Sequence, residues 1–434
     1  MTSIISEDYR WLISEEAAPI LSEVQIEIEN KTNALTIAKK LRKQISPERS
    51  ALVMEQAQLR IRGKKKFSHP ENMFFTRRGL EQSSGRLIAQ YKAMRFAGLK
   101  SVADICCGIG GDLIGLGRRG IRSSSVSGSE ERLEQSEKND SNTFRTIGVD
   151  SDGLTSLFAR CNLEASGLDS SLNSVEQLDF EKFDISSMDG IHIDPDRRKG
   201  DRTVHGSRFS PSLSTIFERV SKNCCLAIKV APATPVADYF PEKLHREWIG
   251  DHRECKQQIL WSEPFSEQLD FRTARTATYI GRNGRVSQIS SSKDELEQPT
   301  QFFDSIHEFF YEPHSAVLAA GMTDVLARRY NLRRFTSQIV YLTGDRFIDD
   351  PLLSCFQVLK ILPMSLRQTV KVLKSLEVGQ VEVKKRGIDN VAAEQYGRMK
   401  LEGPNKATLI LTCLGKKRVA VIAKRQRDDL QMAT

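Results

Sequence analysis

The sequence predicts an α/β fold with an open, mainly parallel sheet, followed by a smaller α+β region. Short apolar runs of strand length recur through the middle of the chain, separated by helix-like stretches. One of these runs, residues 101–106, leads straight into a glycine-rich turn and then into a predicted helix. The length of 434 residues exceeds one average domain, so two or three domains are expected.

The glycine-rich turn contains Gly108, Gly110 and Gly111, and Asp104 lies near the end of the strand before it. Glycine is favoured where the backbone needs a positive φ or lies directly against a ligand. A strand, a glycine turn and a helix N-terminus together form a nucleotide-binding corner. The spacing differs from G-x-G-x-x-G and from a P-loop, and it suits S-adenosylmethionine (SAM), which has no pyrophosphate to neutralise. The alternative is an ordinary strand–turn–helix of any α/β domain.

Acidic residues after the next two predicted strands are candidates to hold the rest of this cofactor. A carboxylate at Asp150 could accept two hydrogen bonds from the ribose hydroxyls. Its distance from the glycine turn is about twice the usual interval, which a Ser- and charge-rich insertion over 118–146 would explain. Glu130, at the usual interval, is the alternative. Asp179 could accept from the adenine amino group, or it could be a turn residue.

The segment just before the first strand, residues 74–96, is predicted to be helical and to pack beside that strand. In SAM methyltransferases a segment at this point often closes over the methionine end of the cofactor. Thr76 and Gln82 are therefore candidates to bind this end.

A candidate site for the methyl acceptor follows the fourth predicted strand, at Asp194-Pro195-Asp196-Arg197-Arg198. Open α/β sheets place their active sites at the carboxyl ends of strands. Asp194 could accept the hydrogens of an attacking amine or act as a base. The stacking aromatic residue of nitrogen methyltransferases is missing, but an arginine plane can stack on a base and pair with phosphate. The alternative is a surface turn held by ion pairs.

The end of the fifth predicted strand indicates which atom of the substrate accepts the methyl group. Methylation of a pyrimidine at C5 needs a cysteine nucleophile, and the end of this strand reads Lys229-Val230-Ala231-Pro232. Cys224 and Cys225 lie too early, inside the strand. Nitrogen, or else oxygen, is therefore favoured as the acceptor, because direct transfer needs mostly positioning.

Positive charge is concentrated in two segments of the chain. Residues 31–66 carry eleven basic and two acidic side chains, and residues 360–434 carry sixteen basic and seven acidic ones, although the whole chain has a net charge of only +8. Two basic regions around an acidic middle suggest a polyanionic partner such as RNA. Solvated helix faces are the alternative.

The eight cysteines show no C-x-x-C spacing and no Cys/His cluster, so neither a metal site nor a disulfide framework is expected. The N-terminus has no signal-peptide pattern, and no apolar run approaches the ~18 residues of a membrane helix. We therefore expect a soluble, cytoplasmic protein without membrane contact.

We expect an N-terminal helical segment over 1–70, the α/β domain over 71–284, a polar linker over 285–300 and an α+β region over 301–434. In the last region, two helices divided at Pro313 are predicted first, and then a helix and three strands.

Several stretches together resemble bacterial class I SAM-dependent methyltransferases that carry a C-terminal THUMP-like domain. The core is also similar to trimethylguanosine synthases, which share the D-x-x-C-G-x-G-G turn. The resemblance covers roughly residues 70–280 and 305–425 and implies a Rossmann-like sheet, SAM as cofactor and an RNA substrate. The stretches are FFTRRGLEQSSG, DICCGIGGD, the loop at 194–198, YEPHSAVLAAG and VEVKKRG.

The resemblance implies a role for each candidate residue. Asp104, the three glycines and Asp150 would bind the cofactor, and Asp179 would lie near its adenine. The loop at 194–198 would meet a base nitrogen of rRNA or tRNA. A small-molecule methyltransferase and a non-catalytic RNA-binding protein are the alternatives; the basic regions argue against the first and the intact glycine turn against the second. The residues implied to contact RNA are Lys384, Lys385 and Arg386.

Overall fold

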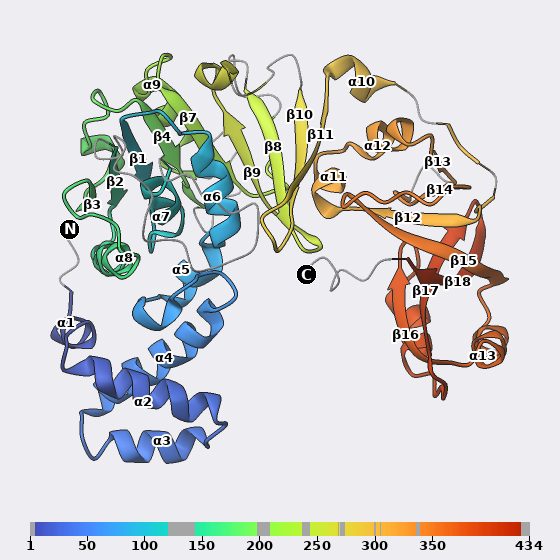
Figure 1. Ribbon diagram of the computed structural model, residues 1–434, viewed down its shortest axis with the longest axis horizontal. Helices are drawn as coiled ribbons and strands as arrows, with labels where there is room; N and C mark the ends of the chain where they lie inside the picture. Colours follow the sequence, from blue (N-terminus) through green and yellow to red (C-terminus); the bar gives the residue numbers. More distant parts are fainter. Residues whose placement is uncertain are drawn as a thin grey trace, which may run out of the picture. The chain divides into compact units, whose positions relative to one another are not determined.

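The computed structural model describes residues 5–119, 144–197, 209–236, 244–267, 269, 274–298, 301–303, 305–335 and 339–426. The described residues divide into two compact units (Figure 1). The first comprises Met1–Val230, Val236–Leu244 and Leu260–Asp270, and the second comprises Ala231–Pro235, His245–Ile259 and Phe271–Thr434.

The predicted N-terminal helices are confirmed. Ser46 and Pro47 begin the longest of them as expected, because the Ser46 hydroxyl accepts a hydrogen bond from the Arg49 amide and proline occupies the first turn. The helices bury one core together with Ile109 of the glycine turn and Phe158. They therefore belong to the same compact unit as the parallel sheet. The helices are α1 (Glu7–Leu12), α2 (Ala17–Glu29), α3 (Ala34–Leu41) and α4 (Pro47–Gly63).

The parallel sheet of the first unit is also confirmed. Its strands follow the order β7-β4-β1-β2-β3, and each neighbouring pair is parallel. The central strands are buried along nearly their whole length, which explains why they read as continuous apolar runs. The strands are β1 (Ser101–Ile105), β2 (Arg145–Asp150), β3 (Asn173–Gln177), β4 (Gly190–Ile193) and β7 (Cys225–Val230).

The strand order creates a switch point between β1 and β4. The chain runs outward from β1 to β2 and β3, and then returns to the other side of β1 as β4. Connections therefore leave the carboxyl ends of β1 and β4 in opposite directions, and such a switch point is where open α/β sheets form their ligand-binding crevice. The glycine turn follows β1, and the loop of Asp194 follows β4. The helices of this region are α5 (Arg77–Gln82), α6 (Arg86–Met94), α7 (Gly111–Gly117), α8 (Gly153–Ala165) and α9 (Leu213–Arg219).

In the second unit, the predicted linker over 285–300 is wrong as a description of local structure. Residues Val286–Ser291 form β11, which pairs antiparallel with β10 (Arg275–Ile280), and Lys293–Glu297 form α10. The polar composition concealed a strand whose Ile289 is buried and a helix that begins with a capping box at Ser292. The other strands before this point are β8 (His245–Asp251), which pairs parallel with β10, and β9 (Glu254–Trp261).

The second unit also contains a mixed sheet with the order β13-β14-β12-β15-β18-β17-β16. The helix predicted before Pro313 is wrong: Phe309–Pro313 is the strand β12, and both helices follow it. The consecutive aromatics Phe309, Phe310 and Tyr311 are all buried, because the two faces of this strand pack against different cores. The helices are α11 (Ser315–Ala319) and α12 (Thr323–Arg329).

The late helix and three strands are confirmed. The strand β16 pairs parallel with β17, and β17 forms a hairpin with β18 through Gly415. The long strand β15 was not predicted. The elements are β13 (Arg333–Arg334), β14 (Leu342–Gly344), β15 (Leu353–Pro363), α13 (Leu366–Ser375), β16 (Val378–Lys385), α14 (Asn390–Gly397), β17 (Asn405–Leu414) and β18 (Lys417–Arg425). Among the described residues, no helix combines the length and the apolar composition that a membrane crossing requires.

Candidate functional site

The glycine turn bends sharply between β1 and α7. Cys106, Gly108 and Gly110 all have left-handed backbone conformations, with φ of 55°, 56° and 88°. A left-handed residue other than glycine costs roughly 1–2 kcal/mol, so Cys106 is held there by the surrounding structure. The amides of the turn are hydrogen-bonded: the Cys107 amide donates to the Val149 carbonyl of β2 at 3.1 Å, and the Gly110 amide donates to the Cys107 carbonyl at 3.0 Å.

The three glycines of the turn have different reasons to lack a side chain. A Cβ on Gly108 would meet no atom within 4 Å, so this position faces open space. A Cβ on Gly110 would contact Ala159 of α8 at 3.7 Å, and one on Gly111 would lie 3.0 Å from the Cβ of Ser83. Gly108 is therefore the glycine that leaves room for a ligand, whereas Gly111 is required for close packing against the segment before α6.

Asp150 lies at the end of β2, directly beside this turn. Its Oδ2 accepts a hydrogen bond from the Gly108 amide at 3.0 Å, and its Oδ1 accepts one from the Asp152 amide at 3.0 Å. Burial raises the pKa of Asp150, and the two amides oppose that shift. An open glycine face beside a strand-end carboxylate fits the adenosyl part of SAM. The alternative acid, Glu130, and most of the Ser-rich insertion lie outside the described residues.

The other proposed cofactor residues make local contacts. The Thr76 hydroxyl accepts from the Gly79 amide and begins α5. Asp179 is exposed and lies 3.6 Å from the Nζ of Lys182. Their roles toward a cofactor remain proposals.

The predicted acceptor loop begins at the switch point. The Asp194 amide donates to the carbonyl of Ile105, the last residue of β1, at 3.1 Å. The Oδ2 of Asp194 accepts from the Nζ of Lys229 at 2.6 Å, and the Asp194 side chain is still 34% exposed. Lys229 also donates to the main-chain carbonyl of Gln82 at 3.0 Å, which ties α5 to this point. Asp194 is thus a carboxylate held from one side and open on the other.

The rest of the loop is less constrained. Pro195 is buried, and Asp196 forms an exposed ion pair with Arg78 at 2.8 Å. Asp196 and Arg197 form β5, which pairs with β6 (Phe209–Ser210). Arg198 lies outside the described residues.

Behind this crevice lies a buried charge network that the sequence analysis missed. Lys92, Asp104, Asp112 and His192 are each only 1–7% exposed. The Nδ1 of His192 lies 2.7 Å from Asp104, and its Nε2 lies 3.1 Å from the Nζ of Lys92. Lys92 in turn lies 2.7 Å from Asp112, and Lys229 lies 3.8 Å from Asp112. Lys229 therefore connects the carboxylate of Asp194 to this network inside the sheet.

The arrangement determines how these groups are charged. Burial alone would raise the pKa of Asp112, but Lys92, His192 and Lys229 together hold it below the ordinary value. Burial raises the pKa of Asp104, and His192 only partly opposes this. Burial would lower the pKa of Lys229, but Asp194 and Asp112 outweigh it and raise the pKa. The Nδ1 of His192 is directed at Asp104 and its Nε2 at Lys92, whose pKa is lowered by burial.

One signal could have revealed this network. Asp104 and His192 are polar residues inside strands that are otherwise apolar, and they stand opposite each other in the register of β1 and β4. Buried polar groups need partners, so the two were candidates for pairing. Lys92 and Asp112 carry no comparable local signal.

The lowered pKa of Asp112 predicts how stability depends on pH. Because its pKa is lower in the folded protein than in the unfolded chain, the ionised carboxylate stabilises the fold above the ordinary value of about 4. This contribution is lost as the pH falls through the lowered value. We expect Asp112→Asn to reduce the free energy of unfolding by about 3–5 kcal/mol at pH 7, and the difference from wild type to shrink below pH ~4.

Denaturant unfolding at pH 7, 5, 4 and 3 measures this difference. Glu164→Gln on α8 is the matched control, because Glu164 is exposed. A difference between wild type and Asp112→Asn that stays constant over this pH range would contradict the assignment.

Asn162 of α8 is a second residue that the sequence analysis missed. Its amide nitrogen donates to the carbonyls of Phe74 and Ile109 at 2.9 and 2.8 Å, and its carbonyl accepts from the Phe74 amide at 2.7 Å. It therefore holds the segment before α5 against the glycine turn.

The three basic residues expected to contact RNA do not share one environment. Lys384 is paired with Glu312 at 2.5 Å, and its side chain is only 14% exposed. Arg386 lies 4.0 Å from the same carboxylate. Lys385, between them, is exposed. Successive strand residues point to opposite faces, which separates Lys385 from its two neighbours.

Within the described part of the chain, no group of at least three His, Cys, Asp or Glu side chains is placed to hold a metal ion.

The C-terminal region of the chain matches a known protein family. Residues 353–425 match the family model described as THUMP domain-like. This part of the chain is a THUMP-like domain. It begins with β15 and ends with β18, and therefore includes the unpredicted strand.

Two curated relatives, from the CDC 1551 / Oshkosh and H37Rv strains of Mycobacterium tuberculosis, are both named uncharacterized S-adenosylmethionine-dependent methyltransferases. Each is 25% identical to this chain over 346 residues, which span 79% of this chain and 85% of the relative. The match extends well beyond the THUMP-like domain.

A crystal structure of a protein described as a methyltransferase, from Porphyromonas gingivalis W83, superposes with a TM-score of 0.69. It is 22% identical and covers 88% of this chain and 92% of its own. At this identity the likeness shows the fold. The predicted resemblance is therefore confirmed: a methyltransferase fold precedes a THUMP-like domain.

Proposed function

We propose that this chain, a SAM-dependent methyltransferase, transfers the methyl group to a base nitrogen in rRNA or tRNA. One observation carries the proposal: the open face of Gly108 and the exposed edge of Asp194 follow adjacent strands at one switch point. A cofactor site and an acceptor site are thereby brought together, as a direct transfer requires.

When bound, SAM supplies an electrophilic methyl group on its sulfonium. The residues that we propose to line its site are Gly108, Gly110, Gly111, Asp150, Asp179 and Thr76. Asp104, which is only 1% exposed and faces His192, would support this site from behind. Asp194 accepts a hydrogen bond from the acceptor nitrogen and takes its proton. Lys229 orients Asp194 through the 2.6 Å contact.

The cysteines beside the turn support nitrogen over C5 as the acceptor. A C5 methyltransferase needs a thiolate. Burial, reinforced by Asp150 and by Asp104, raises the pKa of Cys106 and of Cys107 well above the ordinary value. Both therefore remain thiols at neutral pH and are poor nucleophiles.

The THUMP-like domain and the basic regions support RNA as the partner. We propose that Lys385 contacts phosphate from the surface of β16, with Lys384 and Arg386 contributing from its other face. The loop of Arg197 and Arg198 would contact the acceptor nucleotide, flipped or single-stranded. The eight cysteines are free thiols, which suits a reducing compartment such as the cytoplasm.

Nucleoside mass mapping tests this function. RNA from cells that lack the protein should lose one methylated nucleoside, and purified protein with labelled SAM should restore it to that RNA. Transfer of label to a small molecule but not to RNA, or restoration of a C5-methylated pyrimidine, would contradict the proposal.

A further inference from the structure

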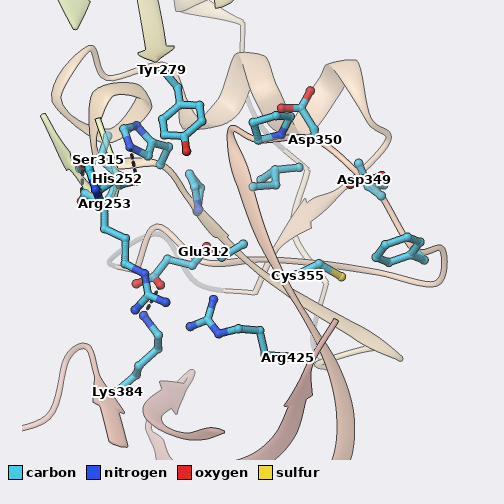
Figure 2. Close-up of a pocket in the computed structure, with 18 of the residues that line it drawn as sticks. His252, Arg253, Tyr279, Glu312, Ser315, Asp349, Asp350, Cys355, Lys384 and Arg425 are labelled. Atoms are coloured by element: carbon cyan, nitrogen blue, oxygen red, sulfur yellow. Dashed lines mark hydrogen bonds and ion pairs between the residues drawn. The ribbon is translucent and has the colours of Figure 1, made fainter. Parts of the chain in front are cut away.

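The second unit contains a cavity of about 270 Å³ that includes no residue of the proposed methyl-transfer site (Figure 2). Two of its lining residues, Lys384 and Arg386, are also proposed to contribute to RNA contact. Its walls come from the turn between β8 and β9, the start of α11, the loop before β15 and the strands β16 and β18. These segments are far apart in the sequence, so the cavity is a product of the tertiary fold.

Hydrogen bonds to main-chain groups fix the walls of the cavity in place. His252 has a left-handed backbone with φ of 48°, and its carbonyl lies 3.1 Å from the Nε2 of His314. The Ser315 hydroxyl donates to the Arg253 carbonyl at 2.8 Å. The His314 amide donates to the Leu352 carbonyl at 2.8 Å. The cavity is therefore preformed, as small-ligand sites usually are.

One end of the cavity is strongly basic. Arg253, Lys384 and Arg425 converge around Glu382, at 3.0, 3.9 and 2.9 Å. Lys384 also lies 2.5 Å from Glu312 (Figure 2). Arg386 adds a fourth cation, 4.0 Å from Glu312. Four cations therefore share two carboxylates, and this end keeps an excess of two positive charges.

The opposite end is acidic, with Asp349 and Asp350 in the loop before β15 (Figure 2). Asp350 accepts from the Tyr330 hydroxyl and from the Leu352 amide, which holds the loop. Asp349 is exposed. Tyr279 and Phe347 contribute aromatic side chains to the lining of the cavity, and Phe347 is 50% exposed.

From this polarity we infer that the cavity binds a nucleoside monophosphate unit. The phosphate lies at the end with Arg253 and Arg386, where a charge of about −1.5 to −2 at pH 7 matches the excess of two cations. An amino group of the base donates to Asp349, and the base stacks on Phe347. This site is separate from the methyl-transfer site and does not depend on it.

The volume limits the ligand to one nucleotide. Pockets for drug-sized ligands span about 300–1,000 Å³, so this cavity has no room for a strand. The source is therefore either a free nucleoside monophosphate or the 5′-terminal nucleotide of a phosphorylated RNA. Both present the same monoester phosphate and base.

Calorimetric titration of the full chain with CMP, UMP and cytidine tests the chemistry. We expect CMP to bind roughly tenfold more tightly than UMP, because only CMP offers the amino group to Asp349. Cytidine, without the phosphate, should show no binding. Equal affinity of CMP and UMP would overturn the role of Asp349, and equal affinity of CMP and cytidine would overturn that of the basic end.

A second arm uses single-stranded RNA hexamers with a 5′-phosphate or a 5′-hydroxyl. If the 5′-phosphorylated hexamer binds and neither the 5′-hydroxyl hexamer nor CMP does, the ligand is the 5′ end of an RNA. If CMP binds as well, the site also takes the free nucleotide. If neither CMP nor the phosphorylated hexamer binds, the inference is overturned.

Substitutions of residues that line the cavity test whether the nucleotide binds there. Arg253→Gln and Asp349→Asn should each weaken binding about tenfold or more. The matched controls are Arg367→Gln on α13 and Asp294→Asn on α10, which are exposed and do not line the cavity. All four variants should keep wild-type SAM affinity. Unchanged nucleotide affinity in the two cavity variants would overturn the inference and leave the methyl-transfer proposal standing.

Discussion

Gly108→Arg is expected to reduce SAM affinity by about 100-fold or more, the equivalent of roughly 2.7 kcal/mol. The missing Cβ of Gly108 faces open space beside the amide that Asp150 accepts from. A long cationic side chain would occupy that space. The φ of 56° adds strain that only glycine avoids without cost. Isothermal titration of SAM into both proteins measures the effect.

Gly167→Arg is the matched control for this experiment. Gly167 also has a left-handed backbone, with φ of 69°, and a Cβ there would meet nothing within 4 Å. It follows the C-terminal end of α8 and does not belong to the turn after β1. The strain is therefore similar while the crevice is unchanged. Equal SAM affinity in Gly108→Arg and Gly167→Arg would remove the glycine turn from the cofactor site.

Asp194→Asn is expected to lower the single-turnover rate of methyl transfer by about 10²–10⁴-fold, the usual range for loss of a general base. The amide keeps the shape of the side chain but cannot take a proton. SAM affinity should stay within about threefold of wild type, because Asp194 follows β4 rather than the glycine turn. Rapid-quench transfer to RNA and SAM titration measure the two quantities.

The fold should survive this change, because Lys229 retains the Gln82 carbonyl at 3.0 Å and Asp112 at 3.8 Å. Glu176→Gln on β3 replaces an exposed carboxylate in the same sheet and should leave both rate and affinity unchanged. If Asp194→Asn lost SAM affinity in proportion to rate, Asp194 would be a cofactor residue and the acceptor assignment would fail.

Local sequence patterns were sufficient to predict secondary structure wherever the structure of a segment depends on its own residues. The strand before Gly108, the helix that begins at Ser46 and the hairpin at Gly415 follow from apolar runs, caps and glycine. They were insufficient where packing outweighs composition. The strand of Phe309 has apolar residues on both faces, so its alternation is hidden, and the strand of Ile289 has only one other apolar residue, Val286, so it reads as a polar segment.

The sequence by itself determined the α/β fold, the glycine turn and the place of Asp194 at a strand end, because each depends on residues close together in the chain. Only the tertiary structure decided that Lys92 meets His192, one hundred residues away, and that Lys384 faces a cavity while Lys385 does not. A charged side chain can be buried only where a distant segment supplies a partner. Such partners are chosen by the packing of the whole unit, and no local pattern records them.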